Sequence, residues 1–130
     1  MFISYSVVIE DFARRHYIKS FEKKYKGAWD VTLRAITEQF KRIDVLLETP
    51  VADYICGSGN VRIFKTEFRI TGTQESRKSS GNRCIVAVHT DTTTVHILLV
   101  YQKTDLSGKN ETAEWKQLVR DNYSEYGSIL

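Results

Sequence analysis

The sequence predicts a single α+β domain, in which a helical hairpin packs on a small antiparallel sheet and an extra C-terminal helix follows. Two observations carry this prediction. An apolar stripe with helical spacing runs through residues 29–48, and three β-rich segments joined by short loops follow between residues 61 and 104. At 130 residues, the chain has room for one hydrophobic core. We therefore treat residues 1–130 as one domain.

The first half is expected to form one strand and two helices. Residues 1–9 are rich in β-branched and aromatic side chains, which favours a short strand. A helical hairpin is expected over residues 11–48, with Asp11 as an N-cap and Gly27 at the turn. Pro50 cannot continue the second helix. The stripe of that helix steps by three and four: Leu33, Ile36, Phe40, Ile43 and Leu47.

The second half is expected to form a meander and a closing helix. Residues 56–60, Cys-Gly-Ser-Gly-Asn, predict a flexible loop. A three-stranded antiparallel meander is expected over 61–104, with its last strand, 95–103, covered on both faces. A helix is expected over 110–123, where Trp115, Leu118 and Val119 are apolar. We expect helices on one face of the sheet, and charged side chains on an open opposite face: Lys65, Glu67 and Arg69.

Composition narrows the class of protein. With 42% hydrophobic residues the chain should fold, and it holds no apolar run of the roughly 18 residues that a membrane helix needs. Its first residues lack the basic segment and small-residue cleavage site of a signal peptide, so we expect a cytoplasmic protein. Cys56, Cys84 and three scattered histidines have no metal-ligand spacing. No glycine-rich phosphate loop follows a strand, so we expect neither metal nor cofactor.

Positive charge is concentrated in residues 62–83. This stretch has six basic residues against Glu67 and Glu75, a local excess of four in a chain whose net charge is +3. Such an excess favours an acidic partner. The basic residues are Arg62, Lys65, Arg69, Arg77, Lys78 and Arg83.

This basic cluster suits cleavage of RNA. The 2′-hydroxyl of RNA is an internal nucleophile held beside the phosphate, and cationic side chains stabilise the charge that develops during its attack. A solvated charged strand face with structural histidines is the competing interpretation. The candidate groups for acid–base catalysis are Lys65, Glu67, His89, Tyr101, Asp105 and Glu111.

Two segments carry a family resemblance. Residues 78–83 read Lys-Ser-Ser-Gly-Asn-Arg, and residues 101–105 read Tyr-Gln-Lys-Thr-Asp after an apolar strand. With residues 64–70 before them, they resemble the RelE/ParE superfamily of toxins, nearest to its HigB-like branch. There a basic strand leads into a Lys-Ser-Gly-Gly-x-Arg loop, and a later strand ends in an aromatic-x-Lys pattern. Here Ser80 replaces a common glycine and Glu67 interrupts the basic strand face.

The resemblance implies a type II toxin–antitoxin system toxin: an endonuclease that cuts messenger RNA at the ribosome, without metal, by 2′-hydroxyl attack. It implies a cognate antitoxin as partner, and no membrane or small-molecule cofactor. The implied catalytic residues are Lys65, Arg69, Arg83 and Lys103. The implied RNA-binding residues are Arg62, Arg77, Lys78 and Tyr101. Two alternatives stay open: a ParE-like toxin that binds a protein such as DNA gyrase, and an inactive relative that binds nucleic acid or a partner.

Overall fold

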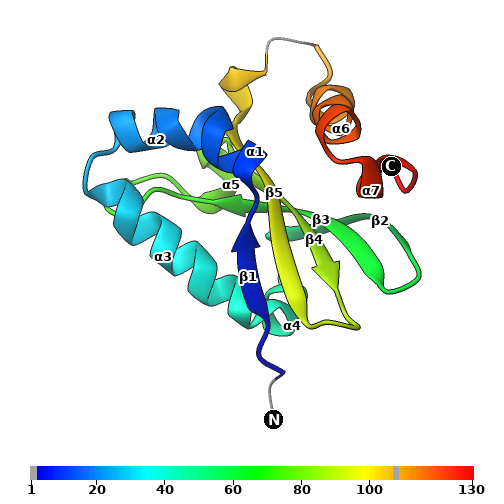
Figure 1. The fold of residues 1–130 in the computed structure, drawn as a ribbon. Helices are drawn as coiled ribbons and strands as arrows, with labels where there is room; N and C mark the ends of the chain where they lie inside the picture. The colour runs from blue at the N-terminus through cyan, green and yellow to red at the C-terminus, as the bar shows by residue number, and fades with distance from the viewer. Residues whose placement is uncertain (1–2, 107–108) are drawn as a thin grey trace.

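A mixed five-stranded sheet forms the centre of the computed structural model, which describes residues 3–106 and 109–130. Its strand order is β1-β5-β4-β3-β2 (Figure 1). The three neighbouring pairs from β5 to β2 are antiparallel, and β1 pairs parallel with β5. The strands are β1 (Ser6–Ile9), β2 (Ala52–Ser58), β3 (Val61–Phe68), β4 (Asn82–His89) and β5 (Thr94–Gln102).

The expected α+β class and antiparallel meander are confirmed, and the sheet has one strand, β2, that was not expected. Residues 56–60 are not a free loop, because Cys56–Ser58 belong to β2 and the tight turn to β3 follows at once. Pairing with β3 outweighs the weak strand propensity of this segment. The strand expected over residues 1–9 is β1, and Met1 and Phe2 lie outside the described residues.

The N-terminal helical hairpin covers one face of the sheet. Its longest helix, α3, has a buried stripe that includes Trp29, Ile36 and Phe40, close to the stripe expected from the sequence. The first arm is broken at His16 and Tyr17, which leave helical geometry. This break lets Tyr17 pack toward the C-terminal segment. The elements are α1 (Asp11–Ala13), the π-helical turn η1 (Arg14–Ile18), α2 (Lys19–Lys24), α3 (Ala28–Lys41) and α4 (Ile43–Leu46).

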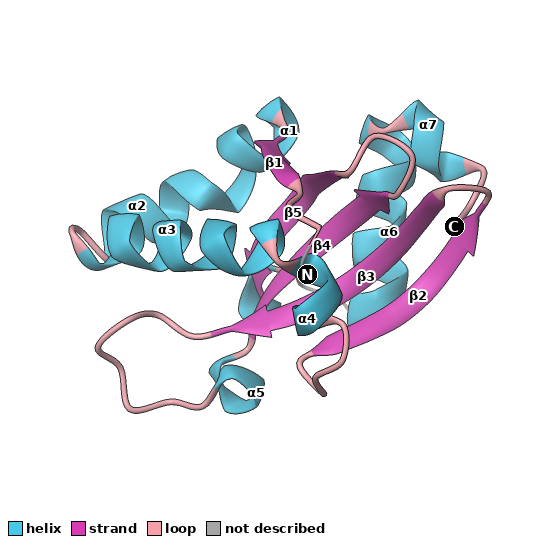
Figure 2. Ribbon diagram, turned by 90° about the horizontal axis from the view of Figure 1, so that it is seen from below, coloured by secondary structure: helices cyan, strands magenta, loops and turns pink. Residues whose placement is uncertain are grey.

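The opposite face of the sheet is not open, which corrects the sequence-based expectation. Helices α6 (Glu111–Asn122) and α7 (Ser124–Gly127) pack on it (Figures 1 and 2). The sheet therefore has a hydrophobic cluster on each side, and β5 contributes to both, as expected for a central strand. The aromatic side chains that cover this face are Trp115, Tyr123 and Tyr126. They place the N-terminus of α6 beside the charged residues of β3 and β4.

Candidate active site

The best-defined polar constellation joins β4, β5 and α6. The Glu111 carboxylate accepts a hydrogen bond from the Tyr101 hydroxyl at 2.6 Å and another from Arg83 Nε at 3.2 Å. Arg83 and Tyr101 are cross-strand partners, so both side chains leave the same face of the sheet. Glu111 is the first residue of α6, which Asn110 caps through the Ala113 amide at 3.0 Å. Helix capping and strand register together fix the three groups.

Lys65 and Glu67 lie on the same face as this constellation. Both residues share a strand face with Ile63, which packs in the cluster beneath α6. Glu67 is directly opposite Arg83, and Lys65 is diagonal to Arg83, a separation of roughly 7–8 Å between cross-strand positions. We define the Arg83 cluster as Lys65, Arg83, Tyr101 and Glu111. It contains two cations, one carboxylate and one phenol.

The Arg83 cluster is largely buried but remains partly exposed to solvent. The side chains of Arg83 and Glu111 are 13% and 28% exposed, whereas Tyr101 is fully buried. Arg83 Nη1 is buried and makes no hydrogen bond within the described residues. A buried guanidinium nitrogen left without an acceptor is energetically costly.

The Tyr101 hydroxyl is a hydrogen-bond donor in this site. Burial raises its pKa far above the ordinary value for tyrosine, and the Glu111 carboxylate that accepts its hydrogen bond raises that pKa further. The phenol therefore stays protonated. Tyr101 can orient Glu111 or donate to a phosphate, but it cannot act as a base near neutral pH.

Thiolate chemistry has no support in the structure. Burial raises the pKa of the Cys84 thiol to about 12, and burial also raises the pKa of Cys56. Within residues 3–106 and 109–130, no three His, Cys, Asp or Glu side chains gather as metal ligands would. None of the helices in those residues has the length and apolarity to cross a membrane.

Arg69 and Arg77 lie in a different place from the Arg83 cluster. β3 ends at Phe68, so Arg69 lies just beyond the strand. Both arginines line a cavity of about 190 Å³ that reaches α3, with Thr32, Thr71 and Gln39 as its other polar side chains. The sequence pattern had placed Arg69 on one face with Lys65.

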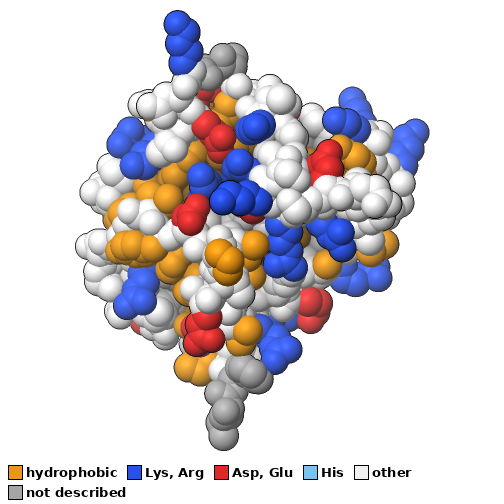
Figure 3. All heavy atoms as spheres, turned by 180° about the vertical axis from the view of Figure 1, so that it is seen from behind, with side chains coloured by type: hydrophobic (Ala, Val, Ile, Leu, Met, Phe, Trp, Pro, Cys, Tyr) orange, Lys and Arg blue, Asp and Glu red, His pale blue; other side chains and the backbone are white. Residues whose placement is uncertain are grey.

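The other basic candidates lie at two places: two lysines are at the end of the sheet near Gly81, and Arg62 is on the opposite face from the Arg83 cluster. Lys78, in α5 (Arg77–Ser80), and Lys103, in the 3₁₀ turn η2 (Lys103–Asp105), are exposed near Gly81. Arg62 leaves the sheet on the side of the N-terminal hairpin, since it shares a strand face with Phe64, which packs in the cluster beneath that hairpin. On the space-filling surface, Lys and Arg side chains gather with Asp and Glu between them (Figure 3).

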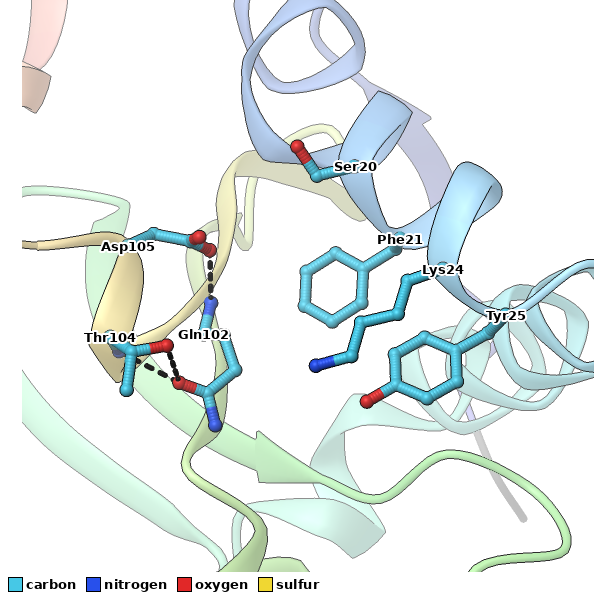
Figure 4. Close-up of a pocket in the computed structure, with 7 residues that line it drawn as sticks. All are labelled: Ser20, Phe21, Lys24, Tyr25, Gln102, Thr104 and Asp105. Carbon is cyan, nitrogen blue, oxygen red and sulfur yellow. Dashed lines mark hydrogen bonds between the residues drawn. The ribbon is translucent and has the colours of Figure 1, made fainter.

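A small pocket of about 70 Å³ lies between α2 and η2, and no sequence pattern predicts it. The Lys24 ammonium and the Tyr25 hydroxyl are directed into it, facing Gln102 (Figure 4). On the η2 side, the backbone N–H of Gln102 donates to Asp105, and its side chain accepts from Thr104. The Asp105 carboxylate is therefore a capping group at the start of η2.

His89 is also separated from the Arg83 cluster. Five residues of β4 lie between Arg83 and His89, a distance of roughly 20 Å along an extended strand. Its Nε2 is 2.7 Å from the Tyr126 hydroxyl, and its ring lies 4.7 Å from that of His96. His96 in turn pairs with Glu10 at 2.9 Å. This histidine pair holds α7 to the sheet.

Comparison with known proteins adds one structural likeness. No protein-family model matches the chain, and no curated protein matches it. Among solved structures, the chain is similar to one in the crystal structure of an archaeal RelE–RelB complex from Pyrococcus horikoshii OT3. The TM-score is 0.46 at 16% identity, covering 76% of this chain and 94% of that chain. A likeness at this level does not establish a family or an activity.

Proposed function

We propose that the chain is the toxin of a type II toxin–antitoxin system of the RelE type, and that it cuts messenger RNA at the ribosome. The Arg83 cluster carries this proposal. It gathers two cations, a phenol donor and a carboxylate at one half-buried place on the sheet. The ordered motifs between residues 62 and 105 support it from the sequence.

In this proposal, the cations of the Arg83 cluster bind the scissile phosphate. The Arg83 side chain is 13% exposed, and Lys65 projects from the same sheet face. Both stabilise the extra negative charge of a phosphorane-like transition state. The nucleophile is the 2′-hydroxyl of the RNA itself, so the reaction needs no metal-bound water.

The outlying basic residues would hold the RNA strand on either side of the cut. Lys78 and Lys103 are exposed at the end of the sheet where β4 begins, and Arg69 and Arg77 continue from there toward α3. Contacts of this kind recognise phosphates and carry little sequence information. We propose the cytoplasm as the location of the protein and a cognate antitoxin as its partner.

Induced expression in a bacterial host tests this function. Wild-type chain should stop incorporation of labelled amino acids within minutes and leave cleaved messages. Arg83→Ala should abolish both effects because it removes the phosphate-binding guanidinium, while Arg15→Ala, on the exposed surface of η1, should behave as wild type. Normal protein synthesis with soluble wild-type protein would contradict the proposal.

One observation favours an alternative without RNA cleavage. Glu67 and Glu111 balance Lys65 and Arg83 on this face, so the local charge is neutral. A ParE-like toxin that binds a protein such as DNA gyrase, or an inactive relative, does not require a cationic surface here. Growth arrest with intact messages and a DNA-damage response would support the first, and unaffected growth the second.

A further inference from the structure

We infer that Glu111, at the start of the C-terminal helix, accepts the proton from the attacking 2′-hydroxyl. This inference rests on the proposed function, because it names a catalytic group for that reaction. It also makes α6 part of the active site rather than a cover over the sheet.

The geometry leaves one oxygen of Glu111 available. Both of its hydrogen bonds, from Tyr101 and from Arg83, end on Oε2. Oε1 makes no hydrogen bond with any residue that the structure describes, and 28% of the side chain is exposed. The carboxylate is thus oriented by two donors on one oxygen and open to substrate on the other.

The location of Glu111 matches the path of the proton. A phosphate bound to Arg83 would lie beside the carboxylate, because Arg83 already contacts that side chain. The ribose attached to the phosphate would then bring its 2′-hydroxyl within reach of Oε1. A general base must lie within a hydrogen-bond distance of roughly 2.6–3.2 Å of the proton that it removes. Because Arg83 would contact both the phosphate and Glu111, it would hold the two close together.

The reaction balances with this assignment. The 2′-hydroxyl gives its proton to Glu111 as the bond from O2′ to phosphorus forms. The bond from phosphorus to the 5′ oxygen breaks, and that oxygen leaves with a proton from water. The products are a 2′,3′-cyclic phosphate and a 5′-hydroxyl, and Glu111 then releases its proton to solvent.

The other candidate groups fit this role less well. Tyr101 is a donor to Glu111, His89 lies at the far end of β4, and Asp105 accepts the Gln102 backbone N–H. Glu67 is the main rival because it is opposite Arg83. Glu67 makes no hydrogen bond to Arg83 or Tyr101 among the described residues, so nothing orients its carboxylate toward a bound phosphate.

Cleavage by purified full-length protein on programmed ribosomes tests this inference. Glu111→Gln keeps an acceptor for Tyr101 but removes the base, so we expect the cleavage rate to fall by about 10²–10⁴-fold. Binding to ribosomes that carry a message with a 2′-deoxy cleavage site should change by less than about threefold.

Two matched variants make the outcome specific. Glu114→Gln, one turn along α6, should cleave within about threefold of wild type, and Glu67→Gln should lose less activity than Glu111→Gln. If Glu111→Gln cleaved at the wild-type rate, or if only Glu67→Gln lost cleavage, the role of Glu111 would be overturned while the proposed function would stand. A folded wild-type protein that leaves the message intact would overturn the proposed function itself.

Discussion

At the scale of residues, the account depends on the two hydrogen bonds that end on Glu111. A carboxylate bonded to a buried phenol and a guanidinium is a charge-assisted arrangement, with single bonds worth about 1.5–3 kcal/mol. Arg83 and Tyr101 lie on neighbouring strands, and Glu111 lies on α6. The contacts among the three residues therefore form only when α6 packs on the sheet.

His89 gives a residue-scale prediction about pH. Burial lowers the pKa of His89 below its ordinary value of 6.5, and the neighbouring His96 lowers it further, against the opposing influence of Asp91, Glu125 and Glu10. The unfolded chain therefore binds a proton more readily than the folded chain, and acid favours unfolding. Stability present above pH 6.5 should be lost as pH falls from 6.5 toward the lower pKa of the folded state.

Urea unfolding at pH 8 and pH 5.5 measures this effect. His89→Gln should lose less stability than wild type between the two pH values, because it has no imidazole to protonate beside Tyr126. His16→Gln changes an exposed histidine and should keep the wild-type pH dependence. An unchanged pH dependence in His89→Gln would contradict the prediction.

At the scale of elements, the junction between α5 and β4 sets the start of the strand that carries Arg83. Gly81 adopts φ 78° there, and its carbonyl accepts the Lys103 amide at 2.8 Å. A Cβ at this position would lie 2.7 Å from Gln102 Nε2, which donates to the Ser80 carbonyl at 2.9 Å. The glycine thus permits both the left-handed turn and the contact between β4 and β5.

Gly81→Ala should lower the free energy of unfolding by about 1–3 kcal/mol, from backbone strain together with displacement of Gln102. Gly59→Ala is the matched control. Gly59 also has a positive φ, 60°, but a Cβ there would meet nothing within 4 Å. We expect the smaller loss for Gly59→Ala in urea unfolding, and equal losses would contradict the role assigned to Gln102.

At the scale of the whole molecule, the sheet separates basic residues that are neighbours in sequence. Lys65 faces α6, whereas Arg62 leaves on the side of the N-terminal hairpin. With a net charge of only +3, the protein surface as a whole should attract RNA weakly. Binding should therefore depend on which face a cation occupies.

Salt titration of RNA binding tests this separation. Lys65→Ala should weaken binding and reduce the slope of log K against log salt by about 1, because one phosphate contact is lost. Arg62→Ala removes the same charge from the other face and should leave the slope unchanged. Equal effects of the two substitutions would show that binding follows net charge and not the Arg83 cluster.

Sequence reasoning succeeded where local patterns decide the structure. The apolar stripe through Ile36 and Phe40 predicted α3, and the apolar run around Leu98 predicted a strand covered on both faces. It failed at Cys56–Ser58, where glycine and serine mask a strand that forms only by pairing with β3. Local propensity cannot report such pairing.

The candidate site shows the same division. Arg83 and Lys65 were singled out as members of the basic stretch 62–83, and the family resemblance implied their catalytic role. Glu111 was only one of six acid–base candidates, since its contact with Arg83 spans 28 positions and depends on how α6 docks. Arg69 was grouped with Lys65 because the alternation gives no sign that β3 ends at Phe68.

The most direct test of the central claim is end mapping of one messenger RNA in a bacterial translation extract after addition of the purified protein. The account predicts fragments ending in 2′,3′-cyclic phosphate with the wild-type chain and none with Arg83→Ala. An intact message in the presence of folded wild-type protein, or equal cleavage by Arg83→Ala, would contradict it.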